Sequence, residues 1–330
     1  MADDADVAIR VDGLRKAYGD VQALAGVDFA VREGELFGFL GPNGAGKTTT
    51  INVLTGLARA DAGTIRVGGV DCTRDPRAAQ HLIGVVPDES NLYPELTGFE
   101  NLCFCAALYG MRKAEREARA RELLGTFGLA DAGDRGLGGY SRGMKRRLTI
   151  AAGIIHKPPI LFLDEPTTGI DVASARQVRQ LIADLHQAGT TIFLTTHYIE
   201  EAERLCERIA FIVRGRIVRT DRVSDLMQPI QDRHVLLLSV RHPDAGLPER
   251  LSGAFPGLSI ESAGQGRIRA ESNEPIRIGP LVRFLEEQGV EPVEARQVRP
   301  SLEDVFVQTT GIEADAMRKE KEKAGGGGGA

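Results

Sequence analysis

The chain has 330 residues, of which 42% are hydrophobic and 26% charged, and its formal net charge is −5. This length suits one large α/β domain with a smaller one, and the acidic balance leaves no footprint for nucleic acid, so none is expected as a partner. No run approaches the roughly 20 apolar residues of a membrane span, and the acidic start is unlike a secretory signal, so a cytoplasmic chain is expected.

Strand patterns dominate the first quarter of the chain. Short strands are predicted between Val7 and Val31, with a turn at Tyr18-Gly19, and then an apolar strand over Leu36–Leu40. A helix is predicted from Thr49 to Leu57. Further strands are predicted at 64–67 and 83–86.

The stretch Gly41-Pro-Asn-Gly-Ala-Gly-Lys-Thr48 lies between that apolar strand and that helix and fits the phosphate-binding pattern G-x-x-x-x-G-K-[ST]. Its glycines let the backbone N–H groups point inward, and the helix that follows adds the positive end of its dipole. Lys47 is expected to reach the β- and γ-phosphates, and the Thr48 hydroxyl to hold Mg²⁺. The alternative is a glycine-rich turn with a chance lysine. The residues expected to contact nucleotide here are Gly41, Pro42, Asn43, Gly44, Ala45, Gly46, Lys47, Thr48 and Thr49.

Helices and strands alternate after this loop. The predicted helices cover 99–109, 113–127, 144–155, 174–186 and 199–207, and the predicted strands cover 160–163, 191–195 and the hairpin 209–213/216–219. This alternation favours a mostly parallel sheet with helices on both faces. The arginine-rich stretch Arg142 to Arg147 could bind nucleic acid locally.

The apolar strand Ile160 to Leu163 ends in Asp164-Glu165, which places two carboxylates where doubly wound sheets carry their sites. Asp164 is expected to hold Mg²⁺ directly or through water, and Glu165 to polarise the water that attacks the γ-phosphate. The alternative interpretation of this pair is a strand that simply ends in an exposed acidic turn, which is a common pattern in isolation.

The pattern changes after about Met227. Residues 228–311 are predicted to run strand, helix, strand, strand, helix, strand and a short final helix, the order of a βαββαβ ferredoxin-like unit. The segment 312–330 is charged and glycine-rich and is expected to be disordered.

Taken together, residues 5–227 resemble the nucleotide-binding subunit of ATP-binding cassette (ABC) transporters, with a helical subdomain at about 90–158. The phosphate loop resembles the Walker A motif, and Ile160 to Glu165 the Walker B strand. Tyr140-Ser-Arg-Gly-Met144 is similar to the family signature, and Pro166 to Asp171 to the D-loop. Tyr18 stands where the family stacks an aromatic ring on adenine, and His197 where it has a switch histidine.

The resemblance implies an α/β P-loop NTPase fold that binds ATP and Mg²⁺ and hydrolyses ATP, with Lys47, Glu165 and His197 as the catalytic residues. Ser141 and Gly143 would act in trans on the ATP held by the other subunit of a dimer, which is a homodimer or a pair with another ATPase subunit.

Two residues depart from the family pattern. Arg142 replaces a signature glycine, and Asp88 replaces the glutamine of the Q-loop. A carboxylate can still bind Mg²⁺, so Thr48, Asp88 and Asp164 are the expected metal ligands, although Asp88 adds negative charge beside the phosphates.

The segment Asp88 to Glu100 resembles the Q-loop region through which exporter ATPases contact a permease, with Leu92, Tyr93 and Leu96 expected to be exposed there or to cap the helical subdomain. The C-terminal unit resembles the appendage of the drug-resistance group, which includes the daunorubicin-resistance ATPase. The resemblance therefore implies an exporter subunit held by a separately encoded permease at the cytoplasmic membrane face. The alternatives are a soluble, non-transport ABC ATPase and an importer ATPase.

Overall fold

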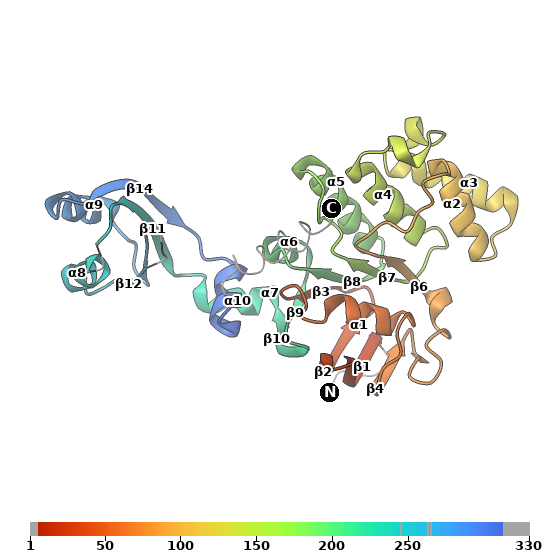
Figure 1. Cartoon of the computed structure of the whole chain (residues 1–330), viewed down its shortest axis with the longest axis horizontal. Helices are drawn as coiled ribbons and strands as arrows, with labels where there is room; N and C mark the ends of the chain where they lie inside the picture. The colour runs from red at the N-terminus through yellow and green to blue at the C-terminus, as the bar shows by residue number, and fades with distance from the viewer. Residues whose placement is uncertain (1–5, 245, 263, 265, 313–330) are drawn as a thin grey trace. The chain divides into compact units, whose positions relative to one another are not determined.

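The computed structural model describes residues 6–244, 246–262, 264 and 266–312 (Figure 1). The described residues form two compact units, one comprising 6–223 and 309–312 and the other lying within Ser224–Gln308. The segment 312–330 is predicted to be disordered, and all of it after residue 312 lies outside the described residues. Within the described ranges, no helix is long and apolar enough to cross a membrane.

A six-stranded sheet in the order β10-β9-β3-β8-β7-β6 forms the centre of the first unit. Its strands are β3 (Leu36–Leu40), β6 (Ile83–Val86), β7 (Ile160–Asp164), β8 (Thr191–Thr196), β9 (Arg208–Val213) and β10 (Arg216–Arg222). Only β9 and β10 pair antiparallel, so the mostly parallel sheet that the sequence predicts is confirmed. Every residue of β3, β7 and β8 is buried, as expected of parallel strands covered on both faces.

The second sheet of this unit is antiparallel, in the order β2-β1-β4-β5. It is formed by β1 (Val7–Tyr18), β2 (Val21–Arg32), β4 (Ala62–Val67) and β5 (Val70–Asp71). The prediction of short strands near the N-terminus is wrong. Strands β1 and β2 have 12 residues each and pair as one long hairpin. A two-residue turn makes this possible, since Gly19 adopts a φ of +57° that glycine tolerates without strain.

A core of apolar side chains joins the two sheets, and helix α1 (Lys47–Leu54) contributes to it. The ring of Phe193 on β8 lies 5.6 Å from Phe29 on β2 and 5.3 Å from Phe39 on β3, measured between centroids. Burying one such phenylalanine stabilises the fold by about 1.5–3 kcal/mol.

The remaining helices of the first unit lie along the large sheet and beyond its β6 edge (Figure 1). They are α2 (Gly98–Leu108), α3 (Lys113–Thr126), α4 (Arg142–Gly153), α5 (Val172–Gln187) and α6 (Ile199–Leu205), while α7 (Val223–Met227) belongs almost wholly to the second unit. The segments α2, α3 and α4 occupy the region predicted to be the helical subdomain. The start of α2 is fixed by a capping box, in which Thr97 and Glu100 bond reciprocally to backbone N–H groups.

The second unit has the sheet order β12-β13-β11-β14, with every neighbouring pair antiparallel. Its elements are β11 (His234–Arg241), α8 (Leu247–Ala254), β12 (Ser259–Ser262), β13 (Arg267–Ser272), α9 (Ile278–Glu287), β14 (Glu291–Val298) and α10 (Leu302–Thr310). This is the split βαβ arrangement of a ferredoxin-like unit, which the order of elements predicts. Its core includes Leu236 and Leu238 of β11 and Leu281 and Leu285 of α9.

The strand order brings three functional segments together in the first unit. The phosphate loop follows β3, Glu165 follows β7 and His197 follows β8, and these strands are neighbours in the order β3-β8-β7. Since they are parallel, their carboxyl ends meet at one edge of the sheet, where open α/β sheets bind ligands.

Candidate functional site

The phosphate loop runs from the end of β3 to the start of α1, with Gly46 as the N-cap of the helix. Gly46 has a φ of +109°, and a Cβ at this position would lie 2.7 Å from the carbonyl oxygen of Ala23. Any other residue would therefore strain the loop. The N–H groups at this helix start form the kind of cradle that holds an anion.

Lys47 is buried and folds back over its own loop. Its Nζ donates hydrogen bonds to the carbonyl oxygens of Gly41 (2.7 Å) and Pro42 (3.1 Å), and it lies 3.2 Å from Oε1 of Glu165. The ammonium group is thus already placed at the loop, paired with the carboxylate that follows β7.

Asp164 is a buried carboxylate held by two hydroxyl groups. Thr48 Oγ1 donates to Oδ2 at 2.8 Å, and Thr195 Oγ1 donates to Oδ1 at 2.5 Å. Burial raises the pKa of Asp164, even though both hydrogen bonds lower it. A divalent cation beside Thr48 and Asp164 would offset this cost, and their oxygens are ligands that Mg²⁺ prefers, so the residues present fit the ion. Mg²⁺ is commonly held by one or two carboxylates together with substrate phosphates.

Glu165 has a strained backbone and a side chain fixed by several partners. Its φ of +48° lies in the left-handed region, which costs a non-glycine residue about 1–3 kcal/mol and is typical of functional sites. Oε2 accepts hydrogen bonds from Nδ1 of His197 (2.7 Å) and from Thr168 (3.1 Å). Burial alone would raise the pKa of Glu165, but the hydrogen bond from His197 and the charge of Lys47 outweigh it and lower the pKa to about 2. The carboxylate is therefore ionised and can accept a proton only weakly while Lys47 remains beside it.

Ser141 and Gly143 lie at the start of α4, which begins at Arg142, two residues before the predicted Met144. The reason is that Ser141 is the N-cap, accepting a hydrogen bond from the N–H of Met144 at 3.2 Å. A Cβ on Gly143 would lie 2.1 Å from Oγ of Ser174, so only glycine allows α4 to approach the start of α5 this closely. Ser141 and Arg142 are both exposed.

The other predicted contacts differ in how exposed they are. Tyr18 ends β1 with its ring 49% exposed, and Lys16 Nζ lies 5.1 Å from the ring centroid. Asp88 is exposed. The pKa of Asp164 is raised mainly by the burial of Asp164 itself, and the negative charge of Asp88 adds to this effect. The exposure of the remaining loop residues varies. Ala45 is buried, Pro42, Asn43 and Thr49 are half-buried, and Gly44 and Thr48 are exposed.

Three buried polar residues near the site were missed from the sequence: Arg146, Thr195 and Glu201. The prediction that Arg142 to Arg147 could bind nucleic acid locally is wrong for Arg146. Its side chain lies inside the fold, where the guanidinium donates to buried carbonyl groups. A signal existed, since Arg146 falls three residues after Gly143 and four before Ile150 on the inward face of the helix.

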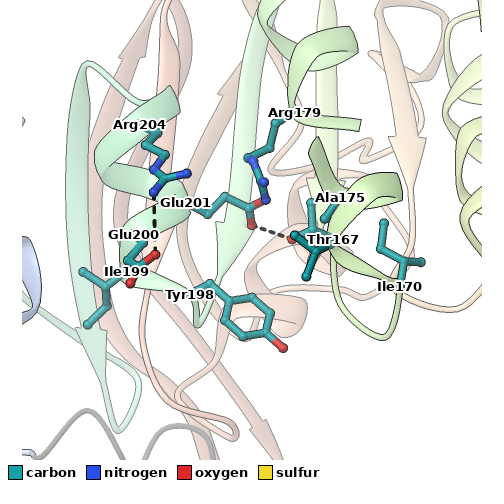
Figure 2. Close-up of a pocket in the computed structure, with 10 residues that line it drawn as sticks. Thr167, Ile170, Ala175, Arg179, Tyr198, Ile199, Glu200, Glu201 and Arg204 are labelled. Carbon is teal, nitrogen blue, oxygen red and sulfur yellow. Dashed lines mark hydrogen bonds and ion pairs between the residues drawn. The ribbon is translucent and has the colours of Figure 1, made fainter. Parts of the chain in front are cut away.

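Glu201 of α6 joins two of the loops at the site. Its Oε2 accepts hydrogen bonds from Thr167 (2.8 Å) and Thr196 (3.2 Å), and its Oε1 lies 3.9 Å from a guanidinium nitrogen of Arg179. Thr167, Arg179 and Glu201 line a cavity of about 440 Å³, and Figure 2 shows Glu201 between Arg179 and Thr167. Burial raises the pKa of Glu201, and the hydrogen bonds from Thr167 and Thr196 oppose this shift.

The predicted exposed set near Asp88 is only partly right. Leu92 is 8% exposed, whereas Tyr93 is 49% exposed and packs edge-on against Phe104 of α2 with centroids 5.0 Å apart. The side chain of Leu92 is therefore buried, and that of Tyr93 is exposed. Tyr93 and Phe104 together form a small exposed aromatic patch on this subdomain.

Comparisons with known proteins agree with this geometry. A family model described as ABC transporter matches residues 24–168. The Daunorubicin resistance ATP-binding protein DrrA2 of Streptomyces coeruleorubidus is 39% identical over 306 residues, which is 92% of this chain and 95% of that protein. The Nod factor export ATP-binding protein I of Paraburkholderia xenovorans (strain LB400) is 43% identical over 222 residues, which is 67% of this chain and 73% of that protein.

Solved structures give the same result for the fold. An ATP-binding subunit of an ABC transporter matches with a TM-score of 0.61 at 30% identity, covering 67% of this chain and 92% of its own. A dimeric ATP-binding cassette in a post-hydrolysis state with ADP and Pi matches with a TM-score of 0.61 at 27% identity. The match covers 65% of this chain and 98% of that cassette. The expected α/β P-loop fold and the resemblance to the daunorubicin-resistance group are thereby confirmed. The chain belongs to the family of ABC transporter ATP-binding proteins and is an ABC-type ATPase.

Proposed function

We propose that this chain is the ATP-hydrolysing subunit of an ABC exporter, working as a head-to-tail dimer beneath a separately encoded permease. The observation that carries this proposal is the convergence of Lys47, Glu165 and His197 at the carboxyl ends of three neighbouring strands. These are the cation, the base and the hydrogen-bond donor that cleavage of a terminal phosphate requires.

ATP binding rearranges the ion pair at the centre of this site. The phosphates of ATP attract Lys47 and draw its ammonium group from Oε1 of Glu165, 3.2 Å away, to the β- and γ-phosphates. Losing this cation raises the pKa of Glu165, which makes its carboxylate a better base for the attacking water. His197 keeps the carboxylate oriented through its 2.7 Å hydrogen bond, and in the proposed mechanism it also bonds to the γ-phosphate and positions the water.

The metal-side residues have a separate task. Thr48 and Asp164, joined at 2.8 Å, would hold Mg²⁺ together with Asp88, and the bound ion supplies positive charge that neutralises the phosphate oxygens. The Thr195 hydroxyl donates a hydrogen bond to Oδ1 of Asp164 and accepts one from the backbone N–H of Glu165. Both acidic residues are thereby held in one orientation.

The dimer follows from the exposed start of α4. Ser141 and the N–H groups of the first turn, with Gly143, make an anion site on the surface of the first unit. The Ser141 hydroxyl accepts a hydrogen bond from the N–H of Met144, and this helix start fits the γ-phosphate of an ATP held by a second copy. The dimeric cassette solved with ADP and Pi supports such a pairing.

Export and membrane attachment are supported by the relatives, whose names refer to drug resistance and to export. We assign the patch of Tyr93 and Phe104 to contact with the permease, which would hold the chain at the cytoplasmic face of the membrane.

The proposal is tested by expressing the chain with and without a candidate permease and measuring how much chain is recovered with the membranes. Recovery should require the permease. Phe104→Glu should abolish it while leaving ATP hydrolysis by the isolated chain intact, whereas Val218→Glu, at another exposed apolar residue, should leave it unchanged. Equal recovery with and without the permease would contradict the proposal.

A further inference from the structure

Arg146 on α4 is a buried cation whose hydrogen bonds tie together two separate segments of the site. Its Nε donates to the carbonyl oxygen of Pro166 at 2.8 Å, and its Nη2 donates to that of Asp164 at 2.7 Å. Its Nη1 donates to the carbonyl oxygens of Asp88, at 3.1 Å, and of Pro87. One side chain thus fixes the backbone of both acidic residues that the proposed function places at the metal.

The charge of Arg146 matters as well as its geometry. Burial lowers the pKa of this guanidinium, and four nearby carboxylates raise it, of which Asp88 is the strongest, followed by Asp164. An arginine remains protonated under such conditions, so a permanent positive charge lies beside the two carboxylates. Burying it is tolerated because carbonyl groups accept from the Nε and from both terminal nitrogens of the guanidinium.

We propose that Arg146 is a positioning residue that sets the register of Asp88 and Asp164 and offsets the negative charge that Asp88 brings to the site. This inference rests on the proposed function, in which both carboxylates face Mg²⁺. It also explains how the chain accommodates an acidic residue where the family pattern has glutamine: the cation on α4 compensates for it.

The planar guanidinium is what this arrangement needs. Its donors point in fixed directions and reach both segments at once, whereas a lysine is a point charge with three rotatable donors. Arg146→Lys therefore keeps most of the charge and loses the geometry, and Arg146→Met loses both. Arg147 provides the matched control, since it is the next residue on the same helix and its Nη1 donates to the carbonyl oxygen of Phe127 at 2.8 Å, away from Asp88 and Asp164.

The test measures ATP hydrolysis as a function of Mg²⁺, with kcat and KM determined separately, and ATP binding in EDTA. For Arg146→Lys we expect kcat to fall by about 10- to 100-fold and the half-saturating Mg²⁺ concentration to rise, the range typical of residues that orient metal ligands. ATP binding without Mg²⁺ should stay unchanged. Arg147→Lys should match the wild type in all three measurements.

A rescue experiment separates positioning from a merely structural role. In Arg146→Met the charge of Asp88 is no longer offset, so adding Asp88→Gln should bring the half-saturating Mg²⁺ concentration back toward the wild-type value. If the Arg146→Met defect is the same with Asp88 and with Gln at that position, the inference is overturned. It is also overturned if Arg146→Lys behaves like Arg147→Lys.

Two controls keep the result interpretable. If neither Arg146 variant gives a cooperative thermal unfolding transition, Arg146→Gln decides: a raised half-saturating Mg²⁺ concentration supports the inference, and a wild-type value overturns it. If the wild-type chain itself shows no Mg²⁺-dependent hydrolysis, the proposed function fails. If the wild type hydrolyses ATP and the Arg146 variants match their Arg147 controls, only the inference fails.

Discussion

Oε2 of Glu165 lies 2.7 Å from Nδ1 of His197, while the other oxygen of the same carboxylate lies 3.2 Å from Nζ of Lys47. The three residues come from three different segments of the chain, yet they form one charged, buried unit. A carboxylate can only accept hydrogen bonds, so the His197 nitrogen that faces it carries the proton.

The role of Glu165 as the base is tested by Glu165→Gln, which keeps the size of the side chain and removes its basicity. We expect ATP hydrolysis to fall by about 10²- to 10⁴-fold, the usual contribution of a general base. ATP binding should persist, so that size-exclusion chromatography shows a dimer trapped with ATP. Glu200→Gln, at an exposed glutamate of α6, serves as the control and should hydrolyse ATP normally. A wild-type rate in the Glu165 variant would remove this residue from its role.

The depressed pKa of Glu165 makes stability depend on pH in a defined window. The pKa is about 2 in the folded protein, against an ordinary value of 4.5, so the folded state favours the ionised form. The resulting contribution is complete above about pH 4.5 and is lost as the pH falls toward 2. We therefore expect the free energy of unfolding of the wild type to drop more steeply over this window than that of Glu165→Gln. Parallel pH profiles from denaturant unfolding would refute this.

Tyr18 offers a half-exposed ring at the end of a hairpin, suited to stacking on adenine. Base–aromatic stacking contributes about 1–3 kcal/mol, so Tyr18→Ala should raise the KM for ATP by roughly 10-fold or more and leave kcat unchanged at saturation. Tyr18→Phe should behave as the wild type. Tyr93→Ala is a matched control, because this ring is equally exposed and lies on the helical subdomain. An unchanged KM in Tyr18→Ala would place adenine elsewhere.

Much of the fold was predictable because its signals are local. The buried strands β3, β7 and β8 are continuous apolar runs, and the phosphate loop is read from adjacent residues. The ferredoxin-like unit followed from the order of its elements. The start of α4 was placed two residues late, although Ser141 is a strong N-cap residue.

What escaped prediction depends on residues that are distant in sequence. The Lys47–Glu165 ion pair joins positions 118 residues apart, and it forms only because β3 and β7 flank β8. The sequence leaves the burial of Leu92 open between an exposed and a capping position, because a loop pattern does not show what will pack against it. Arg146 was read as part of a surface patch because charge alone does not reveal four carbonyl acceptors on other segments.

The central claim is that each ATP lies between Lys47 of one copy and Ser141 of another, and mixing two inactive variants tests it most directly. Lys47→Ala removes the phosphate ligand, and Ser141→Glu repels the γ-phosphate while leaving an acidic residue that a helix start tolerates. Each variant alone should be inactive.

In an equal mixture, half of the dimers contain one copy of each variant, and each mixed dimer has one site with both native residues. The mixture should therefore recover up to about a quarter of the wild-type rate of ATP hydrolysis. Lys47→Ala mixed with the double variant Lys47→Ala/Ser141→Glu should stay inactive. If the first mixture is as inactive as the second, Lys47 and Ser141 do not share a site across two copies, and the account is contradicted.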